Sequence, residues 1–197
     1  MFDEATPQEL AGQPVLSFDT LPDCEAWFAE HHADHRGFWL KIGKVGAAQT
    51  VNYAEALEVA LVYGWIDGQK RGYDETYWLQ RFTPRGPRSK WSQINRDKAE
   101  ALVEAGRMQP AGQAQVDAAK ADGRWAAAYA GSRTIEVPDD LTRALRRNAR
   151  ARRAFEGLDS SNRYAILFRI HDAKRPETRV RRIEQFVTML AEGRTLH

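Results

Sequence analysis

Apolar residues follow two different patterns along the chain, and the change falls near residue 92. Before it, short runs rich in aromatic and branched side chains, at residues 38–42 and 77–83, are typical of β-strands. After it, apolar residues recur every three or four positions, as they do on one face of a helix. The pattern predicts an α+β fold: a small, mostly antiparallel sheet with packed helices, followed by an all-helical C-terminal region.

Local signals place the expected elements. We expect strands at residues 15–18, 38–42, 65–67 and 77–83, with the last two joined as a hairpin because Gly68, Gly72 and Asp74 lie between them. A first helix should begin at Thr20 or Asp23, and a second at Asn52, since Glu55 three residues later forms a weak capping box. Further helices are expected at about 92–105, 110–122, 138–148, 160–172 and 176–192.

The chain should fall into three regions. Residues 1–14 contain two prolines and no apolar period, and are expected to form a flexible arm. Residues 15–130 should form the α+β core, and residues 131–197 a helical region packed on that core. The apolar face of the helical region is predicted to consist of Leu141, Leu145, Phe155, Leu167, Ile183, Phe186 and Leu190.

The composition excludes several classes of protein. Hydrophobic residues make up 43% and charged residues 28%, which is ordinary for a folded globular chain. No stretch approaches the roughly 20 apolar residues that cross a bilayer, so no membrane insertion is expected. The acidic start Met1-Phe2-Asp3-Glu4 lacks the features of a signal peptide, and one cysteine, Cys24, cannot form an internal disulfide. These features together predict a cytoplasmic protein.

Charge is unevenly distributed. Residues 139–197 hold 14 Lys and Arg against 8 Asp and Glu, whereas residues 1–138 hold 15 against 19. The basic run at 143–153 could contact nucleic acid through its phosphates. The same pattern fits the solvated outer face of a helix, and the run has no interleaved aromatic residues for base stacking. A solvated face is therefore favoured, and nucleic acid is disfavoured as a partner.

The strongest candidate for chemistry is the Trp/Arg-rich segment that follows the hairpin. It carries cations on a loop stiffened by Pro84 and Pro87, and the loop leads to a helix start, where free N–H groups favour anions. Guanidinium groups bind phosphate or carboxylate in a two-pronged geometry. We therefore predict a pocket for a small anionic ligand. Its residues would be Trp65, Asp67, Arg81, Arg85, Arg88, Ser89, Trp91, Ser92 and Asn95. In the alternative interpretation, the arginines pair with nearby acids and the tryptophans belong to the core.

Catalytic and metal-binding signals are weak. Asp67 is the only candidate catalytic residue, placed by the hairpin within reach of Arg81, but a structural ion pair is the favoured interpretation. His31 and His35 have the spacing of two zinc ligands on a helix, but no glutamate or second ligand cluster accompanies them, so no metal site is predicted. The chain has no phosphate-binding glycine loop, dinucleotide fingerprint or serine-nucleophile motif, and no cofactor is predicted.

Several phrases taken together resemble a known family. They are Tyr63-Gly64-Trp65-Ile66-Asp67-Gly68, Arg81-Phe82-Thr83-Pro84-Arg85, Ser89-Lys90-Trp91-Ser92-Gln93-Ile94-Asn95, Asp122-Gly123-Arg124-Trp125 and Ala173-Lys174-Arg175-Pro176-Glu177-Thr178-Arg179. In order and spacing they resemble the YdeI/OmpD-associated family, also called bacteriocin-protection proteins, over about residues 15–193. The resemblance implies a cytoplasmic bacterial protein of stress tolerance and carries no established reaction.

Three functions follow from these observations. The first is a protein that binds a small phosphate- or carboxylate-bearing ligand at the Trp/Arg-rich segment and acts in stress tolerance. The second is an enzyme of unknown reaction that uses Asp67 as a base beside the arginines. The third is a nucleic-acid-associated protein that uses the basic C-terminal helices.

Overall fold

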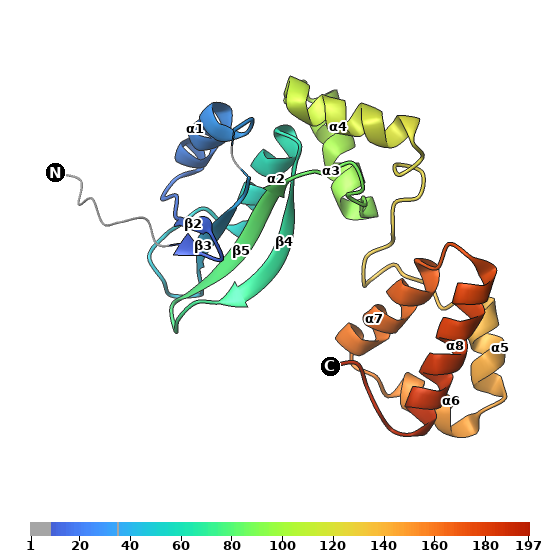
Figure 1. Ribbon diagram of the computed structural model, residues 1–197. Helices are drawn as coiled ribbons and strands as arrows, with labels where there is room; N and C mark the ends of the chain where they lie inside the picture. The colour runs from blue at the N-terminus through green and yellow to red at the C-terminus, as the bar shows by residue number, and fades with distance from the viewer. Residues whose placement is uncertain (1–8, 35) are drawn as a thin grey trace. The chain divides into compact units, whose positions relative to one another are not determined.

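The computed structural model describes residues 9–34 and 36–197 and divides the chain into two compact units. The first unit comprises the chain up to Trp91 together with Asn95–Ala128, and the second comprises Ser92–Ile94 and Tyr129–His197. Figure 1 shows the sheet of the first unit in blue to green and the C-terminal helices of the second in orange to red.

Among the described residues, the sheet has five strands in the order β1-β2-β3-β5-β4. They are β1 (Glu9–Leu10), β2 (Gln13–Leu16), β3 (Phe38–Gly43), β4 (Trp65–Gly72) and β5 (Tyr77–Pro84). Only the pairing of β2 with β3 is parallel; the other three pairings are antiparallel. The expected small, mostly antiparallel sheet is therefore confirmed.

Strand register assigns each side chain to one of the two sheet faces, because successive residues of a strand alternate. The first face carries Phe38, Leu40, Asp67 and Phe82, and packs into the main core. We call the second the basic face. It carries Val15, Trp39, Lys41, Arg71, Tyr77, Leu79 and Arg81.

Helices α1 (Leu21–His31) and α2 (Tyr53–Val62) contribute to the core on the first face (Figure 1). Each begins at a predicted cap: Thr20 accepts from the Asp23 N–H, and Asn52 and Glu55 form a complete capping box. Helices α3 (Gln93–Glu104) and α4 (Pro110–Ala121) follow, and Pro110 occupies a first-turn position, as expected.

The second unit consists largely of helices. They are α5 (Asp139–Arg146), α6 (Ala149–Glu156), α7 (Ser160–His171) and α8 (Pro176–Ala191). A separate hydrophobic core lies among them, and it contains all seven apolar residues predicted for this region. The bidentate contact of Arg179 with Asp140, at 2.6 and 3.0 Å, fastens α8 to α5.

The elements differ from the expectation in three places. Residues 9–14 were expected to belong to a flexible arm, but they form the β1–β2 hairpin; the rest of that arm, residues 1–8, lies outside the described residues. The strand that begins at Trp65 continues to Gly72 instead of ending at Asp67, because a bulge between Asp67 and Lys70 lets pairing resume. Helix α6 was not expected, and it begins where Asn148 caps the Ala151 N–H.

Candidate functional site

The loop of residues 85–91 is built around a buried arginine. Arg85 is only 5% exposed, and its guanidinium carbon lies 3.5 Å from the centre of the Trp91 ring. Its Nη1 donates to the Lys90 carbonyl at 3.2 Å, and its backbone N–H donates to the Gly64 carbonyl at 3.0 Å. Arg85 therefore holds the two ends of its own loop together.

Other polar groups of this loop form hydrogen bonds within the loop or with Arg124. The Ser89 hydroxyl accepts from the Gly86 N–H at 3.0 Å, and the Ser89 carbonyl accepts from Arg124 Nη1 at 2.9 Å. Arg124 in turn pairs with Asp122 at 2.7 Å. Arg88 is the arginine of this loop that is exposed.

The two tryptophans of the predicted site belong to the main core. Trp65 is 1% exposed and donates from Nε1 to the His32 carbonyl. Trp91 is 2% exposed and meets Trp125 at a ring-centre distance of 4.8 Å. Ser92 and Asn95 are also buried; Ser92 forms a β-bridge with Tyr129, so the helix begins at Gln93.

The predicted proximity of Asp67 and Arg81 is wrong. Asp67 pairs with Phe82 and therefore lies on the first face, where its Oδ2 accepts from the Tyr53 hydroxyl at 2.8 Å. Arg81 is one position away on β5 and lies on the basic face, where its Nε donates to Gln13 Oε1 at 2.8 Å. Because neighbouring strand residues point to opposite faces, the sheet separates these two side chains.

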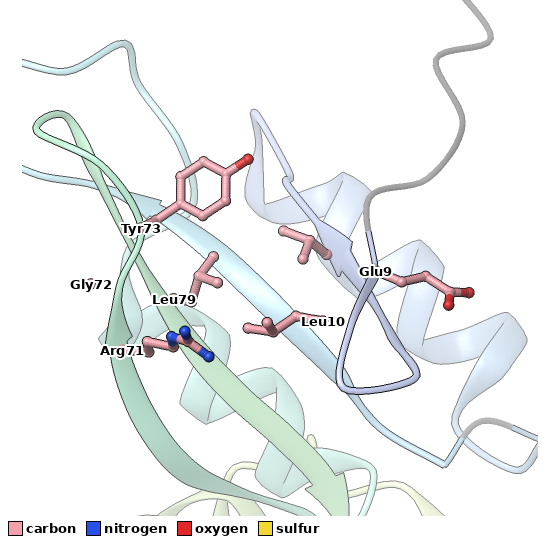
Figure 2. Close-up of a pocket in the computed structure, with 7 residues that line it drawn as sticks. Glu9, Leu10, Arg71, Gly72, Tyr73 and Leu79 are labelled. Carbon is pink, nitrogen blue, oxygen red and sulfur yellow. The ribbon is translucent and has the colours of Figure 1, made fainter.

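A cavity of about 150 Å³ opens on the basic face. Its lining comes from the four strands β1, β2, β4 and β5 and from the turn after β4: Glu9, Leu10, Val15, Arg71, Gly72, Tyr73 and Leu79. Figure 2 shows the Arg71 guanidinium beside Leu79 and Leu10, while the Glu9 carboxylate points away from Arg71. The cavity thus combines three apolar side chains, Leu10, Val15 and Leu79, with one basic residue, Arg71, and one acidic residue, Glu9, whose carboxylate points away from Arg71.

The surroundings of this cavity are also basic. Arg71 and Lys41 flank Leu79 from the two neighbouring strands, and Arg81 lies two residues further along β5 on the same face. The Lys41 ammonium lies 4.7 Å from the centre of the Tyr77 ring. A surface lined by positive charges raises the local concentration of anions.

Arg71, Tyr73 and Lys41 were not among the residues predicted for a site. The signal that identifies them is strand alternation: once β4 is continued past Gly68, Arg71 falls opposite Leu79 and on the same face as Lys41. The bulge at Gly68 and Gln69 obscures this signal. It places two residues of β4 opposite one residue of β5, so the simple alternation of faces along β4 is interrupted.

Nucleophilic and metal chemistry find little support in the described residues. Burial, and next the nearby Glu25 and Glu55, raise the pKa of the Cys24 thiol to about 12, so the thiol stays protonated at neutral pH. Within the described ranges, no three or more His, Cys, Asp or Glu side chains gather as a metal site would require. His31 is exposed, and its proposed partner His35 lies outside the described residues.

The fold and the cavity define a two-unit α+β protein, with a basic sheet face in the first unit and a helical second unit. Residues 16–115 match the family model for a domain of unknown function (DUF8412), and the chain belongs to that family. Residues 134–193 match the model described as bacteriocin-protection, YdeI or OmpD-associated, which confirms the resemblance drawn from the sequence. The residues that match this model all lie in the second unit, whereas the resemblance was expected to cover residues 15–193.

Two further comparisons gave no match, either among curated proteins or among solved structures. Among the described residues, no helix is long and apolar enough to span a membrane.

Proposed function

We propose that the protein binds a small anionic molecule with an apolar part, and that it does so in the cavity on the basic face. The observation that carries this proposal is the position of Arg71 beside the apolar side chains of Leu10, Val15 and Leu79 in the lining of the cavity. The predicted ligand class is therefore retained, while its place moves from the loop of residues 85–91 to the sheet.

The chemistry of the lining favours a particular kind of anion. Arg71 offers a guanidinium fork suited to a carboxylate or a phosphate. The apolar wall favours a ligand whose other end is hydrocarbon, since burying that end releases water. A cavity of about 150 Å³ holds a group as large as a benzene ring. An aromatic or branched carboxylate or phosphate meets all three conditions.

We place this binding in the cytoplasm of a bacterium, in tolerance of stress or of bacteriocins. The description of the family matched by residues 134–193 supports the role in bacteriocin tolerance, and the cytoplasmic location rests on the sequence features alone. An enzyme built on Asp67 receives less support. Its carboxylate is hydrogen-bonded to Tyr53 on the face of the sheet opposite the cavity, and neither Arg81 nor Arg71 shares that face.

The test compares two arginines in the full-length protein. Benzoate and phenyl phosphate should raise the melting temperature of the wild-type protein, whereas benzylamine, of similar shape and opposite charge, should not. Arg71→Gln should abolish the shift because it removes the cation that faces the ligand. Arg88→Gln removes an exposed arginine from the predicted loop and serves as the matched control. A shift that survives in Arg71→Gln and is lost in Arg88→Gln would return the site to the loop and refute the proposal.

A further inference from the structure

Helices α5 and α6 of the second unit present a dense group of arginines, which we call the arginine surface. All six members are exposed, in contrast to the buried Arg85 of the first unit: Arg143, Arg146, Arg147, Arg150, Arg152 and Arg153. They occur within eleven consecutive positions. Like charges at this density repel one another, so the surface favours the binding of a polyanion.

The arginine surface is largely unneutralised. Within residues 9–34 and 36–197, its one ion pair joins Arg152 to Glu156 at 3.8 Å. Other arginines of the same unit have structural partners: Arg179 pairs with Asp140 and donates to the Ile170 carbonyl, and Arg182 donates to the Arg169 carbonyl. Arginines that hold this unit together are thus distinguishable from arginines that face solvent.

The core of the unit fixes the direction of these side chains. Leu141 and Leu145 of α5, and Ala151 and Phe155 of α6, are all buried in the second core. The arginines lie at exposed positions of the two helices and at their junction, and the Asn148 side chain caps α6 immediately after α5 ends. Arg146, Arg147 and Arg150 are therefore concentrated at one short, capped junction.

We propose that the arginine surface binds the phosphate backbone of duplex nucleic acid without reading its sequence. A regular row of phosphates needs only cations, and cations are what this surface offers. A membrane is a poorer match, because the apolar residues of α5 and α6 are already used in the core. Single strands are disfavoured because residues 143–153 contain no aromatic side chain for base stacking.

This proposal reverses the expectation drawn from the sequence, which favoured a merely solvated face. The apolar residues do point inward, as that expectation required. The sequence did not show whether acidic side chains of neighbouring elements pair with these arginines. Among the described residues, five of the six arginines form no ion pair. The proposal is independent of ligand binding in the first unit.

The test measures the fluorescence anisotropy of a labelled 20-base-pair duplex with the full-length protein at several salt concentrations. The triple variant R146Q/R147Q/R150Q should bind at least tenfold more weakly at low salt. Its slope of log affinity against log salt should be less steep by about 3, because each lost phosphate contact removes about 0.9. The control triple R133Q/R175Q/R181Q removes the same charge at exposed positions elsewhere in the unit and should weaken binding threefold at most.

Circular dichroism of both triple variants should match the wild-type spectrum, since all six replaced side chains are exposed. Three results would overturn the proposal. They are no duplex binding by the wild-type protein at 50 mM salt, an equal loss in both triple variants, and binding of polyglutamate or anionic vesicles as tight as binding of the duplex.

Discussion

Arg85 stabilises the first unit through contacts that are made inside the protein. Its guanidinium lies 3.5 Å from the centre of the Trp91 ring and donates to the Lys90 carbonyl, with 5% of the residue exposed. A desolvated cation over an indole ring contributes about 2 kcal/mol, and a hydrogen bond from a charged donor contributes a similar amount. These contacts explain why a cation tolerates burial at this position.

Replacing Arg85 with alanine should lower the free energy of unfolding by about 2–4 kcal/mol, because it removes both contacts and leaves Trp91 less well packed. Urea unfolding followed by tryptophan fluorescence measures the change. Arg88→Ala, in the same loop but exposed, should change the free energy by about 0.5 kcal/mol or less. Equal small effects from both substitutions would show that Arg85 has no structural role.

The burial of Cys24 makes the stability of the folded protein depend on pH in the alkaline range. Burial is the main cause that raises the pKa of this thiol from 9.0 to about 12. Between those values the unfolded chain loses the proton and the folded chain keeps it, so the unfolded state binds fewer protons and stability falls as pH rises. The contribution is fully present below pH 9 and is lost progressively toward pH 12.

We expect Cys24→Ala to flatten this alkaline loss of stability relative to the wild-type protein, because the variant has no thiol to titrate. Chemical unfolding at a series of pH values between 8 and 11 measures the two curves. Every other ionisable group is common to both proteins, so its contribution cancels in the difference. Parallel curves for the two proteins would contradict the burial of a neutral thiol.

At the scale of elements, α2 and α4 approach each other closely at Gly112. A Cβ atom at this position would collide with the Val62 carbonyl and would lie 2.9 Å from the Leu61 carbonyl. Both contacts are with backbone carbonyls of the last two residues of α2, which cannot move aside as a flexible side chain could. Gly112 is therefore required by the packing of the two helices.

Gly112→Ala should destabilise the protein by about 1–3 kcal/mol through overpacking. This sign is opposite to helix propensity, which favours alanine over glycine by about 1 kcal/mol in a helix interior. Thermal unfolding of Gly112→Ala measures the effect, and Ala114→Gly, at an exposed position of α4, calibrates the propensity in the same helix. If Gly112→Ala raised the melting temperature, the close approach of α4 to α2 would be wrong.

Elements were predictable from the sequence where local chemistry decides them. Thr20, Asn52 and Pro110 lie at the starts of helices as expected, since caps and first-turn prolines act on their own backbone. The site was less predictable, because it depends on strand register. Asp67 and Arg81 were close in the expected hairpin. In the structure Asp67 pairs with Phe82, the neighbour of Arg81, and this difference of one residue in register places the two side chains on opposite faces. The burial of Arg85 depends on long-range packing that no local signal records.

At the scale of the whole molecule, the second unit has the features of a domain that folds alone. It has its own core, which includes Leu141, Phe155, Ile166 and Leu190 among its buried residues. A domain of this small size is marginal in stability, but many such domains fold without a partner.

A fragment of residues 129–197 should therefore be helical and should melt cooperatively. Far-ultraviolet circular dichroism measures both properties. The Arg179→Ala fragment should melt at a lower temperature, because it loses the bidentate contact with Asp140, whereas exposed Arg181→Ala should not. A fragment that melts gradually and binds a hydrophobic dye would show that its core needs the rest of the chain.

The whole molecule thus offers two basic surfaces of different design, a sheet face with an apolar cavity and a helical surface of exposed arginines. Binding of a small anion at the first of these is the central claim. The most direct test is to record the backbone amide chemical shifts of the labelled full-length protein during a titration with benzoate. We predict saturable shifts at Gly72, Tyr73 and Leu79, with residues 85–91 unchanged. Saturable shifts confined to residues 85–91, or no saturable shift at any position, would contradict the account.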